Sequence, residues 1–319
     1  MTPGTAREAA QGASRGAVPA GWRAVPLRAR VDLAHGGRWT SLAAPGREWL
    51  WHHPDPAVRA ARAVATGPAF VDAGGGEECL PTVDGAPDHG AVWPLPWVPD
   101  GEGDASVSAD GLVLRRRLST RLDGAVRADY AVRGAPGRAV LHAVHLLLDL
   151  SPAARVQLPQ RGLPAQVREE HGGGAPRRWS TSWPPVVAGR GADRLGPDDG
   201  TAAAVLVPGC HGALVVDGDD ALQLTWRAGG DRPTSLLLWR NLRGWPAAGP
   251  YRSTGLEPLL GAATDLADVE RAAGAGGAHL DERGDASWWL ELRALRRTAS
   301  EDRPGGSART SFSGRRCAT

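Results

Sequence analysis

The sequence predicts an all-β fold, built as one large antiparallel β-sandwich. Two observations carry this prediction: apolar and polar residues alternate with a period of two over many short stretches, and Asp-Gly pairs stand between several of them. Both residues of such a pair tolerate the positive φ angles of a tight hairpin, so these pairs predict antiparallel neighbours. Helical signals are few, and a chain of 319 residues is long enough for one two-sheet domain.

The clearest predicted hairpin joins the alternating runs 111–118 and 125–132 through Asp123-Gly124. A second hairpin is expected around Asp217-Gly218, and Asp-Gly at 110–111 is a candidate third turn. Other short apolar-rich runs between turn residues are also expected to be strands, namely 47–51, 139–148, 202–207, 213–216, 221–226, 235–239 and 288–295.

Both ends of the chain lack this periodicity. Residues 1–20 and 298–319 are rich in Gly, Ala, Ser and Arg and are expected to be disordered tails, which leaves one folded domain at 21–297. The Gly- and Pro-rich interval 189–200 is expected to be a large surface loop. One helix is expected at 264–273, where the first residue, a threonine, can serve as the N-cap.

Composition and charge narrow the classes of function. With 42% hydrophobic residues and a net charge of +2, the chain can bury a full core and shows no dense basic patch, so nucleic acid is not an expected partner. No signal-like segment or run of ~18 apolar residues is found, and the three cysteines lack the spacing of a zinc or redox site. We therefore expect a cytoplasmic protein with no membrane partner, no metal and no other cofactor.

The stretch 72–97 carries the first candidate binding residues. Three consecutive glycines near its start let the backbone approach a ligand closely. Asp88 and His89 follow in a Pro-Asp-His-Gly turn, with Trp93 and Trp97 close behind. An imidazole and indole faces on rigid turns predict a sugar site, because an indole can stack on the C–H face of a pyranose. The alternative is a structural loop whose tryptophans pack into the core.

Histidines also occur in two predicted strands. His142 and His145 are three residues apart in the strand 139–148, so their side chains are expected on opposite faces. A histidine that faces a cavity can titrate near neutrality, whereas a structural role is the alternative for each. His52 and His53 are adjacent and point to opposite faces, so a shared metal is disfavoured and a strand-end pair is expected.

Glu257 is the candidate acid–base carboxylate. It lies in 251–261, which has the pattern turn, short strand, turn, and its neighbours include Leu256, Leu259 and Leu260. Apolar surroundings desolvate a carboxylate and raise its pKa towards neutrality, as a general base at pH 7 requires. The alternative is a surface residue before a strand-breaking proline.

Taken together, these stretches resemble the aldose 1-epimerase, or galactose mutarotase-like, superfamily, and most nearly its hexose-phosphate epimerase branch. Four segments occur in the expected order and cover roughly residues 72–295. They are GGGEECLPTVDGAPDHGAVW at 74–93, HLLLDL at 145–150, LEPLLG at 256–261 and AHLDERGDASWWLELRAL at 278–295.

The resemblance implies a large antiparallel supersandwich with a carbohydrate groove on one concave sheet. It also implies interconversion of the anomers of an aldose without a cofactor. Glu257 would then be the general base at the anomeric hydroxyl, His145 the general acid at the ring oxygen, and His89 a hydrogen-bonding residue. The family's sugar-binding aspartate stays open among Asp217, Asp219 and Asp231. The phosphate-binding branch carries an arginine where this chain has Ala91-Val92, so sugar phosphates are not favoured.

Two further functions stay open. A non-catalytic carbohydrate-binding protein would need the tryptophans near His89 but not the catalytic carboxylate. A glycoside hydrolase or lyase would need a second carboxylate ~5–9.5 Å from the first, for which Glu77 and Glu78 are the candidates. Glu78 and Asp88 are also counted among the expected substrate-binding residues. The expected ligand is a monosaccharide or oligosaccharide, bound by a monomer or homodimer.

Overall fold

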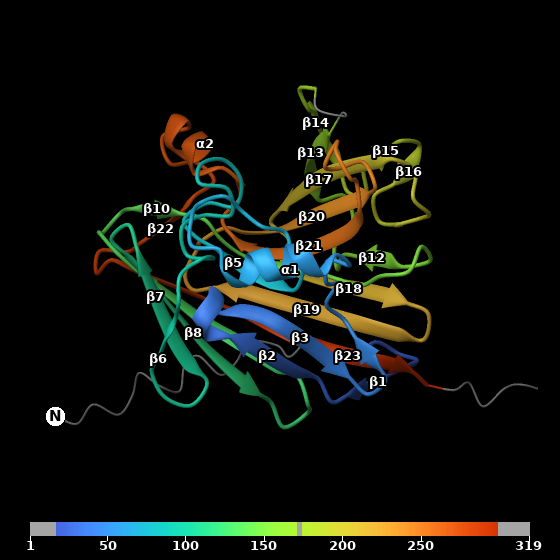
Figure 1. Ribbon diagram of the computed structural model, residues 1–319, viewed down its shortest axis with the longest axis horizontal. Helices are drawn as coiled ribbons and strands as arrows, with labels where there is room; N and C mark the ends of the chain where they lie inside the picture. Colours follow the sequence, from blue (N-terminus) through green and yellow to red (C-terminus); the bar gives the residue numbers. More distant parts are fainter. Residues whose placement is uncertain (1–16, 171–173, 299–319) are drawn as a thin grey trace, which may run out of the picture.

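The structure, a computed structural model, describes residues 17–170 and 174–298. Within these residues, two large antiparallel sheets pack face to face, so the prediction of an all-β sandwich is confirmed (Figure 1). Most of the two predicted tails, 1–16 and 299–319, lies outside the described residues.

The first sheet contains all three predicted Asp-Gly hairpins, β7–β8, β8–β9 and β18–β19. In spatial order its strands are β12 (Arg155–Gln157), β18 (Gly212–Asp217), β19 (Asp220–Ala228), β23 (Asp285–Arg297), β9 (Val126–Arg133), β8 (Leu112–Thr120), β7 (Asp104–Ala109) and β6 (Val98–Pro99), with β1 (Trp22–Val25) also paired to β23.

The second sheet carries the segments with the candidate chemistry. In spatial order its strands are β14 (Arg177–Ser182), β13 (Pro164–Glu170), β17 (Thr201–Pro208), β20 (Thr234–Leu242), β21 (Arg252–Leu260), β11 (His142–Leu147), β5 (Gly76–Cys79), β3 (Arg38–Ala44) and β2 (Arg28–Asp32), with β4 (Arg47–Glu48) paired to β3. Two small pairs lie outside the large sheets, β10 (Ala139–Val140) with β22 (Ala278–His279), and β15 (Val186–Val187) with β16 (Arg190–Gly191).

Three short helical segments connect these strands: η1 (Leu33–His35), α1 (Pro56–Ala63) and α2 (Leu266–Arg271). The predicted helix at 264–273 is thus α2, but Asp265 rather than the threonine caps it, because its carboxylate accepts a hydrogen bond from the backbone N–H of Ala267. Helix α1 was not predicted, although Asp55 followed by proline is an N-terminal helix signal.

The core forms between the two sheets, and the outer face of the second sheet carries a smaller apolar cluster. On β21, Leu256 and Leu260 belong to the inter-sheet core, whereas Leu259 packs on the outer face with Val269 of α2. This alternation follows from the two-residue period of a strand. It sends Glu257 to the same outer face as Leu259.

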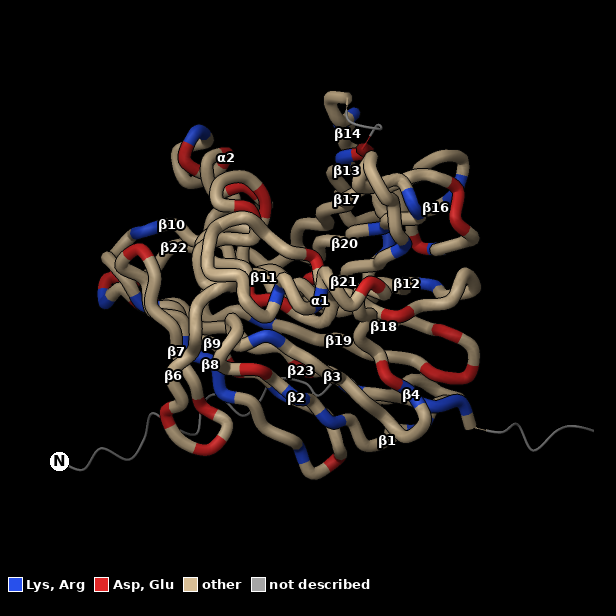
Figure 2. Tube along the Cα trace, in the orientation of Figure 1, with Lys and Arg blue, Asp and Glu red and all other residues tan. Residues whose placement is uncertain are grey.

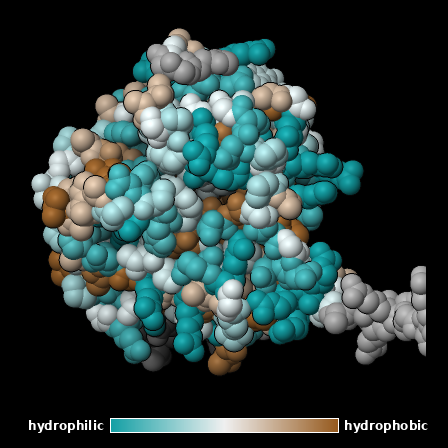
Figure 3. All heavy atoms as spheres, turned by 45° about the vertical axis from the view of Figure 1, so that its right-hand side comes forward, coloured by the Kyte–Doolittle hydropathy of each residue, from teal (hydrophilic) through white to brown (hydrophobic). Residues whose placement is uncertain are grey.

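The surface shows no strong segregation of charge or polarity in the views drawn. Basic and acidic residues are interspersed over both sheets (Figure 2). On the face shown in Figure 3, hydrophobic residues form small groups among hydrophilic ones. In the described part of the chain, no helix is both long and apolar enough to span a membrane.

Candidate active site

A cleft of about 850 Å3 opens on the outer face of the second sheet. Strands β20, β21 and β11 contribute to its floor, and its walls come from the loop 83–89, the segment 262–275 with α2, and the strands β13 and β14. Figure 1 shows α2 at the upper left and the β13–β14 end of this sheet at the upper right, standing apart from each other. Sites for small ligands typically measure ~300–1,000 Å3, so the cleft is large enough for a sugar.

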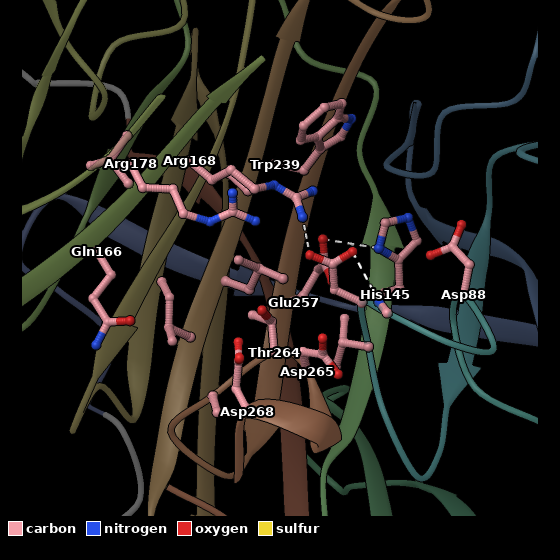
Figure 4. A pocket seen from close by; sticks show the side chains of 18 of the residues that line it. Asp88, His145, Gln166, Arg168, Arg178, Trp239, Glu257, Thr264, Asp265 and Asp268 are labelled. Carbon is pink, nitrogen blue, oxygen red and sulfur yellow. Dashed lines mark hydrogen bonds and ion pairs between the residues drawn. The ribbon is translucent and has the colours of Figure 1, made fainter. Parts of the chain in front are cut away.

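Glu257 and His145 form an ion pair on the floor of this cleft. The register of β11 and β21 pairs Leu146 with Leu256, which places His145 directly across from Glu257. His145 Nδ1 lies 2.9 Å from Glu257 Oε1, and both side chains are buried (Figure 4). His142 faces the inter-sheet core instead, so the prediction that the two histidines face opposite sides is confirmed.

The protonation state of His145 is decided by its charged neighbours. Burial by itself lowers the pKa of this imidazole, because its charged form loses hydration. The negative charge of Glu257, helped by Asp72 and Glu77, outweighs burial and raises the pKa of His145 to about 9. At neutral pH His145 is therefore an imidazolium, a proton donor held beside a carboxylate.

The second carboxylate oxygen of Glu257 is left without a partner. Oε2 is buried and accepts no hydrogen bond from any described residue, and the residue as a whole is only 1% exposed. An unsatisfied buried polar group costs ~1–3 kcal/mol, and more when charged, so this oxygen is available to accept a hydrogen bond from a group that enters the cleft. Gly255 helps to make this room, because a Cβ there would lie 3.0 Å from Glu257 Oε1 and 3.1 Å from Trp239 Cβ.

His89 lies beside the ion pair, on the loop that follows β5. Its ring centroid is 4.8 Å from that of His145, edge to face, and Phe70 stacks on it at 3.5 Å. The carboxylate of Asp88 comes within 2.9 Å of His89 Nδ1, and both residues line the cleft. Glu257, His145 and His89 therefore meet in one cleft, while their roles stay a prediction.

Trp93 and Glu78 do not line the cleft, which corrects the prediction that they bind substrate. Trp93 is fully buried behind Phe70, at a ring distance of 5.1 Å, and Trp97 is also a core residue. Glu78 points between the sheets, because the alternation of β5 sends Glu77 and Glu78 to opposite faces. The alternative of tryptophans packed into the core thus applies to both indoles.

Glu77 lies beside His145 but is already occupied. It is paired with His145 across β5 and β11, and its two oxygens accept hydrogen bonds of 2.8 Å from the buried Arg62 of α1. Arg38 approaches it at 3.1 Å. Asp217 is bound by Ser151 and Arg47, and neither it nor Glu77 lines the cleft. The two carboxylates expected for a hydrolase, Glu77 and Glu78, are therefore both outside the lining of the cleft.

Several residues that line the cleft were not predicted from the sequence: Phe70, Asp72, Gln166, Arg168, Arg178 and Trp239. A signal for part of this set was present in PAQVREE at 164–170. Its alternation buries Ala165 and Val167 in the core and sends Gln166 and Arg168 to the other face. Asp72 and Phe70 lie in an irregular segment, which has no periodicity that could have singled them out.

Acidic side chains dominate the charged lining of the cleft. They are Asp72, Asp84, Asp88, Glu170, Glu257, Asp265 and Asp268. Of the two lining arginines, Arg168 is already held by Asp84 and by Glu170, the latter at 3.0 Å. The lining therefore offers acceptors for hydroxyl groups. Among the residues that the structure describes, no group of three or more His, Cys, Asp or Glu is placed to hold a metal ion.

Comparison with solved structures identifies the architecture. A protein of Escherichia coli K12, named a putative aldose 1-epimerase, is similar with a TM-score of 0.60 and 14% identity over 86% of this chain and 98% of that chain. A galactose mutarotase-like protein of Lactobacillus casei is similar with a TM-score of 0.53 and 12% identity over 86% of this chain and 100% of that one. A galactose mutarotase-like protein of Clostridium acetobutylicum is similar with a TM-score of 0.55 and 10% identity over 86% of this chain and 94% of that chain.

At these identities the likeness shows the fold alone. The chain has the galactose mutarotase-like sandwich that its sequence resemblance implied. Neither the protein-family models nor the curated proteins contain a match to this chain.

Proposed function

We propose that this chain, which has the fold of galactose mutarotase-like proteins, is a carbohydrate enzyme that interconverts the anomers of an aldose. The observation that carries the proposal is the buried pair of Glu257 and His145 in a polar cleft, with one carboxylate oxygen left unpaired. The names of the structural neighbours support the same reaction class by fold only.

The pair supplies both proton transfers that ring opening needs. Glu257 Oε2 takes the proton of the hydroxyl on C1, and the protonated His145 gives a proton to the ring oxygen from the ring nitrogen turned away from Glu257. The bond between C1 and the ring oxygen then breaks, leaving an open-chain aldehyde. Rotation about C1–C2 presents the other face of the aldehyde. Ring closure returns each proton to its starting residue by the reverse steps, so no atom or electron is gained or lost.

His89 and Asp88 are proposed to hold the sugar rather than to transfer its protons. His89 stands edge-on to His145, and the carboxylate of Asp88 lies against its Nδ1. A ring held between Phe70 and Asp88 has little freedom to turn. It can therefore position a sugar hydroxyl next to the Glu257–His145 pair, which lowers the entropic part of the barrier.

The charge of the cleft favours a neutral sugar over a sugar phosphate or uronic acid. Two arginines line the cleft, Arg168 and Arg178, and Arg168 is held by Asp84 and Glu170 (Figure 4). Acidic groups outnumber them in the lining. The acidic side chains would repel an anionic sugar, whereas the hydroxyl groups of a neutral sugar can donate hydrogen bonds to them. We therefore propose a neutral aldose as the substrate.

Polarimetry of freshly dissolved α-D-glucose and α-D-galactose tests the proposal. The wild-type protein is expected to speed the approach to the anomeric equilibrium, and Glu257→Gln to lower kcat by about 10²- to 10⁴-fold, the usual contribution of a general base. Gln keeps the size of the side chain but cannot accept the proton. Glu102→Gln, at an exposed loop position outside the cleft, is the matched control and should retain the wild-type rate.

Other outcomes separate the competing functions. Sugar binding without any acceleration, unchanged by Glu257→Gln, would support the non-catalytic carbohydrate-binding alternative. Release of new reducing ends from an oligosaccharide would indicate a hydrolase. A Glu257→Gln protein with wild-type mutarotation would overturn the role of the carboxylate.

A further inference from the structure

Trp245 stands out among the exposed side chains. Of the large hydrophobic residues that are exposed in the described part of the chain, it is the only aromatic one, with 41% of its surface accessible. A single exposed hydrophobic residue is common and needs no explanation by itself. Trp245, however, also lines the cleft that contains Glu257 and His145.

The Trp245 side chain belongs to a row of four rings that leads away from the ion pair. Trp239 pairs with Gly255 on β21, two residues from Glu257, and its ring meets that of Trp245 edge to face at 6.0 Å. Trp245 meets Tyr251 at 6.3 Å, and Tyr251 stacks on Trp51 at 5.5 Å. We call Trp239, Trp245, Tyr251 and Trp51 the aromatic row.

The loop that carries Trp245 is held in place from below. The side-chain amide of the buried Asn241 donates to the carbonyl of Trp245 at 2.7 Å, and its oxygen accepts from the backbone N–H groups of Gly244 and Trp245 at 3.0 and 3.1 Å. These three hydrogen bonds fix the backbone on which the exposed indole stands. An aromatic ring that is already ordered loses little entropy when a ligand binds to it.

The aromatic row also connects two hollows. The cleft of about 850 Å3 lies at the end with Trp239 and Trp245, and a second hollow of about 350 Å3 is lined by Tyr251 and Trp51. The cleft is near the upper end of the range for small-ligand sites, and a single pyranose would leave part of it unfilled. The unfilled part adjoins an exposed indole.

We infer that Trp245 is the platform for a second sugar ring, so that the substrate is the reducing end of a neutral oligosaccharide. This inference rests on the proposed function, because the ring beside Glu257 and His145 is the one that opens. The next ring towards the non-reducing end stacks its C–H face on the Trp245 indole. This contact is favourable because it removes the apolar C–H face of the sugar and the indole face from water. The acid-rich lining accepts hydrogen bonds from its hydroxyl groups.

The test compares sugars that share a reducing end. Mutarotation rates and dissociation constants are measured for D-glucose, cellobiose and maltose, and for D-galactose and β-1,4-galactobiose. The wild-type protein is expected to favour at least one disaccharide over its monosaccharide in both measurements. Trp245→Ala should lower that preference by about tenfold, as expected for one aromatic contact, and Trp245→Phe should restore part of it.

Trp289→Ala is the matched control. Trp289 is a partly exposed tryptophan on the opposite sheet, packed under Arg127 at 4.1 Å, and its loss should leave the preference unchanged. The inference is overturned if no disaccharide is favoured over its monosaccharide, or if Trp245→Ala weakens both sugars equally. A disaccharide preference that depends on Trp245 but comes without turnover would sustain the inference and reject the proposed function. Monosaccharide turnover without a disaccharide preference would support the proposed function and reject the inference about Trp245.

Discussion

The buried His145 is a cation that lies between the carboxylates of Glu257 and Glu77. Glu257 approaches it from β21, and Glu77 lies opposite it on β5. Glu77 is neutralised by Arg62, which leaves Glu257 as the partner that most strongly favours the protonated imidazole. Removing one member of a buried ion pair typically costs about 3–5 kcal/mol, because the other charge is left uncompensated. The residues proposed for chemistry therefore also contribute to stability.

The raised pKa of His145 makes the free energy of unfolding depend on pH. The imidazole titrates near 6.5 in the unfolded chain and near 9 in the folded one, so folding favours the bound proton. This stabilisation is fully present below about pH 6.5 and is lost as the pH rises to about 9. Denaturant unfolding should show the free energy of unfolding falling across that window.

The variant His145→Gln isolates this effect. Gln does not titrate, so this part of the pH dependence should disappear, although the variant is expected to be less stable than the wild type at pH 6. The measurement is the difference between the two proteins at pH 6 and pH 9.5. A difference that stays constant between those values would contradict the raised pKa.

At the scale of one element, β21 shows how Gly255 controls the space around the carboxylate of Glu257. Gly255 precedes Glu257 by two positions and shares its face of the strand. A Cβ at this position would meet Glu257 Oε1 at 3.0 Å, Trp239 Cβ at 3.1 Å and Leu147 Cδ2 at 3.3 Å. The strand therefore accommodates the carboxylate and the indole side by side only because position 255 has no side chain.

We expect Gly255→Ala to move the Glu257 carboxylate. Overpacking of this kind costs ~1–3 kcal/mol, and a displacement near 1 Å can lower a rate by about 10²-fold. Mutarotation should therefore fall more than the free energy of unfolding does, and the kinetics are measured together with denaturant unfolding.

Gly212→Ala serves as the control for this change. Gly212 is also a strand residue, but its Cβ would meet only Leu224 O at 3.4 Å and Pro159 at 3.6 Å, which are ordinary contacts. This variant should keep the wild-type rate. Equal losses of rate in both variants would show that the position of Glu257 is not sensitive to Gly255.

At the scale of the whole molecule, buried polar side chains join the two sheets through the core. Glu78 of the second sheet accepts hydrogen bonds from Arg116 and Tyr130 of the first, at 2.6 and 3.0 Å. Trp288 of the first sheet donates to His142 of the second at 2.9 Å. Burial by itself raises the pKa of Glu78, but the hydrogen bond from His142 and the charge of Arg116 outweigh it and lower the pKa to about 2.

Glu78→Gln should destabilise the sandwich without altering the cleft. Arg116 would be left buried without its counter-charge, so the free energy of unfolding is expected to fall by about 3–5 kcal/mol in denaturant experiments near neutral pH. The stabilisation from Glu78 is present above about pH 4.5 and is lost as the pH falls towards 2. KM for the sugar should stay at the wild-type value. A raised KM of Glu78→Gln with an unchanged free energy of unfolding would indicate instead that Glu78 binds the sugar.

Local patterns were sufficient for much of the fold and for part of the site. Asp-Gly turns and alternating runs predicted three hairpins of the first sheet, because turn chemistry and the period of two act over a few residues. The spacing of His142 and His145 predicted their opposite faces for the same reason. The predictions for Trp93 and Glu78 were wrong, because residue type cannot tell whether a loop tryptophan or a strand carboxylate faces ligand or core.

Sequence periodicity was enough to predict the strands of the three Asp-Gly hairpins and the opposite faces of His142 and His145, but it did not predict β2, β3 or β13. Which strands are neighbours follows from the three-dimensional packing alone, and so does the contact that β11 makes between His145 and Glu257, 112 positions away in the chain. The pKa of His145, the unpaired carboxylate oxygen and the aromatic row all depend on that pairing. Charge and packing act through space over a few ångströms, whereas a sequence pattern records only separation along the backbone.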